Sequence, residues 1–179
     1  GEYVVAGDNS GGSVFLFDKD SNTPIRTWSS TQGDIYSLDI SADGKYIVAG
    51  TPNQRIYLFD RDSSTPLWFY EETSMSVPSV AISVNGDYIA AGSDGGTVYL
   101  FGKDSSTPLW SYSTGGDVNS VSISADGMYI VAGSDDDKVY LFNKDSSTPL
   151  WTYDTGGNVI TIAISADGEY ISAGGGEYG

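Results

Sequence analysis

The segment SADGKYIVAG (residues 41–50) sets the period of this chain, because close copies of it recur along the sequence. The copies are SVNGDYIAAG (83–92), SADGMYIVAG (124–133) and SADGEYISAG (165–174), and the tail of the same motif, GEYVVAG (1–7), comes first. A second motif, FDKDSNTPIRTW (17–28) and its copies, keeps the same spacing and carries prolines at positions 24, 66, 108 and 149. Self-similarity at a spacing of about 42 residues indicates a repeat architecture.

Each period holds four short strand candidates, called A to D here, separated by turn residues. In the fourth period they are A (Val118–Ser124), B (Tyr129–Gly133), C (Lys138–Phe142) and D (Pro149–Tyr153). Ala-Asp-Gly (125–127) joins A to B as a tight hairpin in which Gly127 takes a positive φ. Strand C is apolar on both faces, so its sheet needs a similar sheet on each side. Four-stranded sheets stacked around an axis satisfy this need, and the sequence predicts an all-β fold, a β-propeller.

The predicted propeller has four blades of about 42 residues with four strands each. The predicted boundaries are strands B, C and D of blade one in 1–30, blade two in 34–72, blade three in 76–114, blade four in 117–155, and a closing strand A with an extra strand B in 158–174. The closing strand is expected to complete blade one, which removes an exposed sheet edge. Two arrangements stay open: a four-bladed ring made by one chain, and half of an eight-bladed ring or another part of a larger propeller.

The composition excludes several classes of function. The 179 residues include 24 acidic and 8 basic side chains, a formal net charge of −16, and neither Cys nor His. The lack of Cys and His removes disulfides, thiol chemistry and any Ser-His or Cys-His catalytic pair. The negative charge repels nucleic acid and anionic lipid, and no apolar run approaches the roughly 18 residues of a membrane span. We therefore expect no nucleic-acid partner and no membrane insertion.

Two family resemblances support the propeller. The pattern Ser-x-Asp-Gly-x-Tyr-Ile-x-Ala-Gly-Ser, followed by Val-Tyr-Leu-Phe, resembles the A–B–C core of WD-repeat propellers. The segment that follows, with its Pro-Leu-Trp, resembles the quinoprotein (PQQ-like) repeat, whose blade also ends in a Trp. The chain departs from the first family by lacking His and by having Phe in place of the Trp after strand C, at Phe17, Phe59, Phe101 and Phe142. It lacks the vicinal Cys pair of many quinone enzymes, and the resemblance implies no cofactor site.

The charges are expected to separate between the two ends of the propeller. The B–C and D–A loops share one end, called the acidic face here, and the A–B and C–D loops share the other. We predict partner-binding residues on the acidic face: Asp34, Glu71, Glu72, Asp94, Asp117, Asp136 and Asp154. Such a face suits a cationic protein or other macromolecule, helped by the focused negative potential. The alternative is that the aspartates serve turn geometry and solubility and are copied with each repeat.

Two short segments are weak candidates for a metal site. Asp18, Asp20 and Asn22 match the first three ligand positions of a calcium loop, although its later Gly and bidentate Glu are absent. The second candidate is the run Asp135, Asp136 and Asp137. Both segments have the alternative of Asx turns and solvated charges. Ca²⁺ is thus the one candidate ion, and no other cofactor is expected.

Catalysis is not expected of this chain. Asp34 and Asp117 occupy equivalent positions at the start of strand A, near the axis, and a carboxylate pair is what glycoside hydrolysis requires. Equivalent positions in duplicated blades are more simply explained by inheritance than by selection for a reaction. A carboxylate-based glycoside hydrolase therefore stays as the enzymatic alternative.

The tryptophans of strand D have two interpretations. Trp68, Trp110 and Trp151 recur once per blade, and we expect them to pack under the next blade rather than to serve as platforms for sugars. Blade one differs, because Arg26 stands in their place and Trp28 is displaced by two positions.

The favoured function is a non-catalytic scaffold or interaction propeller whose loops contact a macromolecular partner. One alternative is a ligand- or carbohydrate-binding propeller with an axial pocket. Another is a prokaryotic cell-surface structural repeat protein, favoured by the richness in Ser, Thr, Gly and Tyr, the acidity and the lack of Cys. This composition favours an extracellular, cell-surface or periplasmic location over the cytoplasm. A homodimer that completes a larger ring is a further expected assembly.

Overall fold

The computed structural model describes residues 1–29, 33–71 and 75–176, and within these ranges every helix or strand is a β-strand. The strands form antiparallel sheets in which each strand pairs with its neighbour along the chain. The predicted all-β propeller of repeated blades is therefore confirmed.

The strand bounds repeat with the period of the sequence. The first two sheets contain β1 (Tyr3–Gly7), β2 (Val14–Asp18) and β3 (Pro24–Trp28), then β4 (Ser37–Ile40), β5 (Tyr46–Gly50), β6 (Arg55–Asp60) and β7 (Pro66–Glu71). The next two contain β8 (Ser79–Ile82), β9 (Tyr88–Ser93), β10 (Thr97–Gly102) and β11 (Trp110–Ser113), then β12 (Val118–Ile123), β13 (Tyr129–Ser134), β14 (Lys138–Asn143) and β15 (Trp151–Asp154). The last contains β16 (Val159–Ile164) and β17 (Ile171–Gly175).

Strand D of the fourth period begins later than predicted, at Trp151 rather than at Pro149. In the second period the register shifts between Leu58 and Phe59, and this irregularity lets Pro66 pair within β7. The pairing of β14 with β15 has no such shift, so the proline stays outside the strand.

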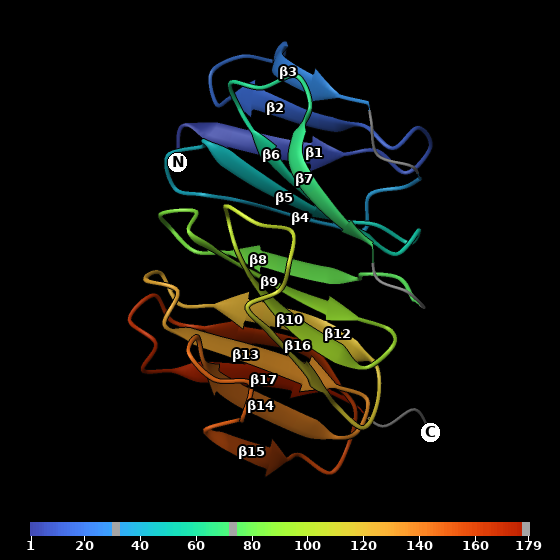
Figure 1. Cartoon of the computed structure of the whole chain (residues 1–179), viewed down its shortest axis with the longest axis vertical. Helices are drawn as coiled ribbons and strands as arrows, with labels where there is room; N and C mark the ends of the chain where they lie inside the picture. Colours follow the sequence, from blue (N-terminus) through green and yellow to red (C-terminus); the bar gives the residue numbers. More distant parts are fainter. Residues whose placement is uncertain (30–32, 72–74, 177–179) are drawn as a thin grey trace.

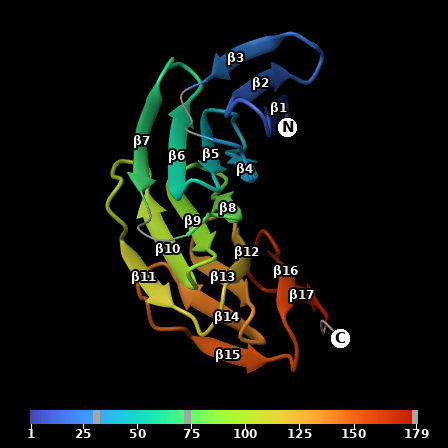
Figure 2. The ribbon, with the colours of Figure 1, turned by 90° about the vertical axis from the view of Figure 1, so that its right-hand side faces the viewer.

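The sheets follow one another along an open arc (Figures 1 and 2). The A strands β4, β8, β12 and β16 line its concave side, and the D strands β7, β11 and β15 line its convex side (Figure 2). The first and last strands, β1 and β17, lie toward opposite ends of the arc (Figure 2). The strand expected to complete blade one, β16, pairs with β17 instead, and among the described residues β1–β3 remain a separate three-stranded sheet. The five sheets do not return to their starting point, so the described residues form an open arc and not a closed ring.

Alternate residues of the B and C strands pack against opposite neighbours. Ile47 and Phe59 lie in a buried cluster with residues of the first blade. Val48 and Leu58 lie in a second cluster with residues of the third blade. Strand alternation thus places apolar side chains on both sides of each sheet, as the repeat requires.

The Ser-x-Asp-Gly turn, which is Ser-x-Asn-Gly in the third blade, is held by its own side chains. In the fourth blade the Ser124 hydroxyl donates to Asp126 Oδ1 at 2.7 Å, and the same oxygen accepts from the Met128 N–H at 2.9 Å. These two hydrogen bonds, led by that of Ser124, lower the pKa of Asp126. Gly127 takes the predicted positive φ, 75°, and a Cβ there would come within 2.5 Å of the Tyr88 ring of the preceding blade. The turn therefore fixes both the hairpin and the distance between blades.

On the concave side, neighbouring blades are joined by side chains that accept hydrogen bonds from backbone N–H groups of the next blade. The hydroxyls of Ser37, Ser79 and Ser120 each accept a hydrogen bond of 2.9–3.2 Å from a backbone N–H of the next A strand. Asp39 adds a carboxylate that accepts from the Ile82 N–H at 2.8 Å. Edge N–H groups that no strand pairs with are satisfied in this way.

On the convex side, tryptophans join the blades. Trp68 Nε1 donates to the Lys103 carbonyl at 2.7 Å, and its ring lies 5.5 Å from that of Phe101. Trp110 repeats this arrangement with the Lys144 carbonyl at 2.8 Å and with Phe142 at 5.2 Å. The prediction that the strand D tryptophans pack under the next blade is confirmed for Trp68 and Trp110, whereas Trp151 is 42% exposed.

The first blade reaches the same contact with different residues. Arg26 Nε donates to the Arg61 carbonyl, at 3.1 Å, in the position that Trp68 and Trp110 serve elsewhere. Trp28, displaced by two positions, donates to a carbonyl two residues further on, that of Ser63, at 2.9 Å. Its ring packs 5.0 Å from Phe59 and is almost fully buried. The displacement therefore keeps the indole in the core.

Candidate partner-binding face

The B–C and D–A loops meet at one end of the blades, as predicted. The Asp135 N–H donates to the Asp117 carbonyl at 2.9 Å, which ties the B–C loop of the fourth blade to the D–A loop before it. The Asp94 N–H makes the equivalent bond to the Ser76 carbonyl at 3.0 Å in the third blade. The acidic face is thus a continuous surface of paired loops.

Three carboxylates of this face influence one another across two blades. Loss of surrounding water raises the pKa of Asp117, and the negative charges of Asp94 and Asp135 raise it further. Asp94 accepts a hydrogen bond from the Ser76 hydroxyl, and Asp135 Oδ1 accepts one of 2.6 Å from the Asn119 amide. A cation placed beside Asp117 would relieve this mutual repulsion.

Asn119 is a residue that sequence reasoning missed. Its amide also donates to the Val159 carbonyl of the next blade at 3.1 Å, so it connects Asp135 to the concave side. Asn119 lies where the register between β12 and β13 shifts, between Val118 and Ser120. The signal was present in the sequence, because the equivalent positions hold Tyr36, Pro78 and Ile160.

Asp136 is placed within the loop rather than on its surface. Its side chain is 9% exposed and accepts from the Gly115 N–H at 2.8 Å and from the Tyr140 hydroxyl. Burial favours a higher pKa, but the hydrogen bonds, led by that of Tyr140, outweigh it and lower the pKa of Asp136. This carboxylate is engaged in holding two loops together.

The other predicted partner-binding residues lie apart from this cluster. Glu71 forms an ion pair of 3.0 Å with Arg55, and Asp154 Oδ1 accepts from the Gly156 N–H at 2.9 Å. Asp34 is partly buried. Glu72 lies outside the described residues.

The candidate calcium-binding residues make hydrogen bonds and ion pairs within their own loops. Asp18 Oδ1 accepts from the Asp20 N–H at 2.9 Å, and Asp20 Oδ2 lies 2.5 Å from Lys19 Nζ. Asn22 is exposed. In the second candidate run, Asp137 has a positive φ of 68° and offers its carbonyl to Thr155. Across residues 1–29, 33–71 and 75–176, no group of three or more carboxylates is arranged to hold a metal ion.

The comparison with known families agrees with this geometry. The family model described as outer membrane protein assembly factor BamB matches residues 73–177, more than half of the chain. The chain belongs to this BamB family of PQQ-like repeats. The model of the WD domain, G-beta repeat, matches residues 22–60, so both predicted resemblances are confirmed. No curated protein sequence matches this chain.

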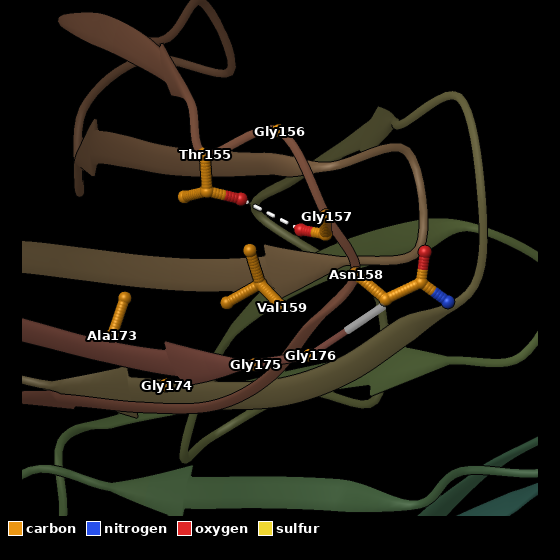
Figure 3. A pocket seen from close by; sticks show the side chains of 9 residues that line it. All are labelled: Thr155, Gly156, Gly157, Asn158, Val159, Ala173, Gly174, Gly175 and Gly176. Atoms are coloured by element: carbon orange, nitrogen blue, oxygen red, sulfur yellow. Dashed lines mark hydrogen bonds between the residues drawn. The ribbon is translucent and has the colours of Figure 1, made fainter. Parts of the chain in front are cut away.

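Membership of the BamB family supports the propeller fold. The chemistry that the site could perform has to be judged from the residues present there. Asp34 and Asp117, the predicted carboxylate pair, precede β4 and β12, with the whole third blade between these strands. A pocket of about 280 Å³ lies at the last sheet (Figure 3). It is lined by residues 155–159 and 173–176, none of which carries a carboxylate. In the described part of the chain, no helix is suited to span a membrane.

Proposed function

We propose that this BamB-family chain is a non-catalytic propeller module that binds a cationic macromolecule through its acidic face. The observation that carries the proposal is a group of three neighbouring carboxylates on the acidic face that make no ion pair among the described residues. On the opposite end, Lys19, Lys103 and Lys144 each lie within 2.6 Å of a carboxylate oxygen. On the acidic face, Asp94, Asp117 and Asp135 have no basic partner among the described residues, and burial together with the charges of Asp94 and Asp135 raises the pKa of Asp117.

Electrostatic complementarity of this kind governs the rate and specificity of encounter more than total affinity. A net charge of −16 extends the attraction over the whole molecule, while the acidic face orients the approach. The description of the matched family as an outer membrane assembly factor supports a location outside the cytoplasm. The lack of Cys and His supports a role without covalent chemistry of those residues.

Binding of decalysine, measured by isothermal titration calorimetry at low salt, tests the proposal. The triple variant Asp94→Asn, Asp117→Asn, Asp135→Asn removes three charges while keeping oxygen acceptors for Ser76 and Asn119. Each lost exposed ion pair is worth about 0.5 kcal/mol, so we expect roughly tenfold weaker binding. The salt dependence of the binding should also decrease.

The matched control removes three charges from the opposite end. Asp62→Asn, Asp104→Asn and Asp145→Asn change the net charge equally, and each of these carboxylates lies within 3.8 Å of its own basic neighbour. The control should bind decalysine nearly as well as the parent chain. Equal weakening in both triple variants would show that net charge alone attracts the peptide and would overturn the assignment to the acidic face.

A further inference from the structure

The loops of blade three surround a hollow of about 390 Å³ at the end of the propeller opposite the acidic face. The A–B loop and strand B supply Asp87 and Tyr88, and the C–D loop and the segment before strand D supply residues 102–105 and Leu109. The Lys103 N–H donates to the Asp87 carbonyl at 3.0 Å, which ties the two loops together. Blade three (β8–β11) lies between two four-stranded blades (Figure 2), so the hollow belongs to the interior of the array and not to an end sheet.

The hollow is open where Gly102 lacks a side chain. The counterparts of Gly102 are Asp18, Asp60 and Asn143, and each accepts a hydrogen bond of 2.8–3.0 Å from a backbone N–H of its own C–D loop. A Cβ at Gly102 would approach Leu109 Cδ1 at 4.0 Å, which is an ordinary contact. The backbone of blade three would therefore accept a side chain at this position, but the sequence leaves the space empty.

The A–B loop of blade three carries a carboxylate that the two adjacent blades lack. Asp87 stands where blades two and four have Lys45 and Met128. Its Oδ1 accepts from Lys103 Nζ at 2.6 Å, and its Oδ2 accepts from the Asn85 amide at 2.7 Å. These two donors hold the carboxylate beside the hollow, and its remaining lone pairs can accept further hydrogen bonds.

The walls of the hollow combine an apolar part with groups that donate and accept hydrogen bonds. Tyr88 and Leu109 supply the apolar part, and Leu109 is 56% exposed. Lys103 supplies ammonium hydrogens, and Asp87 and Asp104 supply carboxylate oxygens. Small-molecule sites have volumes of roughly 300–1,000 Å³ and pair an apolar lining with a few polar groups, and the hollow fits this description.

The charges beside the hollow disfavour a ligand that carries a net charge. Lys103 Nζ lies 2.6 Å from Asp87 Oδ1 and 3.8 Å from Asp104 Oδ2, so charges of both signs share the rim. An anion would be repelled by the two carboxylates, and a cation would compete with the ammonium group that already pairs with them. A neutral ligand with several hydroxyl groups can bond to both kinds of group without such repulsion.

We propose that the hollow of blade three binds a neutral sugar ring. A pyranose has both kinds of surface that the walls require, an apolar C–H face and a rim of hydroxyl groups. The C–H face packs against Tyr88 and Leu109, while the hydroxyl groups donate to Asp87 and Asp104 and accept from Lys103. This site is independent of the acidic face, because its residues come from the loops at the opposite end of the blade.

An NMR titration of the backbone amides tests the proposal on the parent chain. The probes are three neutral methyl glycosides: the α-glucoside, the β-galactoside and the β-N-acetylglucosaminide. At least one should shift the amide signals of Tyr88, Gly102 and Lys103 to saturation, while the signals of Asp94, Asp117 and the rest of the acidic face stay in place. No saturable shift at the hollow with any of the three, at the highest soluble concentration, overturns the proposal.

Three further probes test the choice of ligand class. The anion glucuronate, the cation methylguanidinium and the neutral N-acetyl-leucinamide should each bind at least about tenfold more weakly than the best glycoside. Equal or tighter binding of either ion would refute the charge argument. Equal or tighter binding of the leucine amide would assign the hollow to an apolar side chain of a protein partner, and would likewise overturn the sugar.

One substitution closes the hollow without harming the fold. Gly102→Asn introduces the residue of blade four, and should weaken glycoside binding at least about tenfold. Its free energy of unfolding should not fall, because Asn143 in the same position hydrogen-bonds its own loop. Ser111→Thr is a matched control, since it also introduces a blade-four residue, at an exposed position of β11 outside the hollow.

The control variant should bind the glycoside as the parent chain does. Decalysine binding should be the same in the parent chain and in both variants, so a failure of the acidic face and a failure of the sugar site give different results. Unchanged glycoside binding in Gly102→Asn would show that the sugar lies elsewhere and would overturn the assignment to this hollow.

Discussion

Replacing Gly127 by alanine tests how the turn glycines set the distance between blades. Gly127 has a φ of 75°, and an added Cβ would lie 2.5 Å from Cδ2 of Tyr88 in the preceding blade. Gly156 provides a matched control, since its φ is 78° and an added Cβ would meet nothing within 4 Å. Both substitutions place a methyl group on left-handed backbone, and only one forces a ring to move.

The expected magnitudes follow from these two contacts. An alanine in the left-handed region destabilises the folded state by about 1–2 kcal/mol. Replacing glycine also lowers the entropy of the unfolded chain, which stabilises the fold by about 0.4–1 kcal/mol. Gly156→Ala should therefore destabilise the protein by about 1 kcal/mol. Gly127→Ala adds the displacement of a packed ring, typically 1–3 kcal/mol, and should cost about 3 kcal/mol in total. The difference corresponds to a melting temperature about 4–8 °C lower than that of the control.

Urea denaturation followed by tryptophan fluorescence gives the free energies of unfolding. A double-mutant cycle with Tyr88→Ala identifies the source of the extra cost, because the smaller side chain makes room for the methyl group. Gly127→Ala should then cost no more in the Tyr88→Ala background than Gly156→Ala costs in the parent. Equal destabilisation by the two glycine substitutions, or no coupling with Tyr88, would refute the steric explanation.

Three further predictions follow from individual contacts. Trp110→Phe removes the only side-chain donor to the Lys144 carbonyl among the described residues, and should lower the free energy of unfolding by about 1–2 kcal/mol in urea titrations; an unchanged midpoint would contradict this role. Burial raises the pKa of Asp39 above its ordinary 3.8, so the ionised carboxylate opposes folding above that pH. The stability of Asp39→Ala relative to the parent should thus rise between about pH 3 and pH 7, and a fall would show the opposite sign. Because the chain carries a net charge of −16, its melting temperature should rise with added NaCl, and a decrease would mean that screened ion pairs outweigh self-repulsion.

The blade was predictable from the sequence because its determinants are local. Tyr129–Ser134 and Lys138–Asn143 match the predicted B and C strands to within one residue, since hairpin turns and strand alternation act over a few positions. The closure was not predictable in this way. The curvature that keeps β16 away from β1 depends on the packing of successive sheets, which no single repeat encodes.

The acidic face was predictable as a set of loops but not as a set of side-chain roles. Topology alone brought Asp117 and Asp135 together. The sequence did not reveal that Asp136 turns inward to Tyr140 and Gly115, because that contact depends on the loop of the preceding blade. For the same reason, Arg26 was seen as a missing tryptophan rather than as a donor to the Arg61 carbonyl.

The pairing of each turn glycine with the tyrosine of the preceding blade has a consequence for how such genes change. Gly44, Gly86, Gly127 and Gly168 rest on Tyr3, Tyr46, Tyr88 and Tyr129, so every repeat brings both members of the contact. Recombination between any two copies of the coding segment therefore preserves this Gly–Tyr contact while it changes the number of blades. An array of this kind can lengthen or shorten by whole units in one genetic event, without a compensating substitution elsewhere.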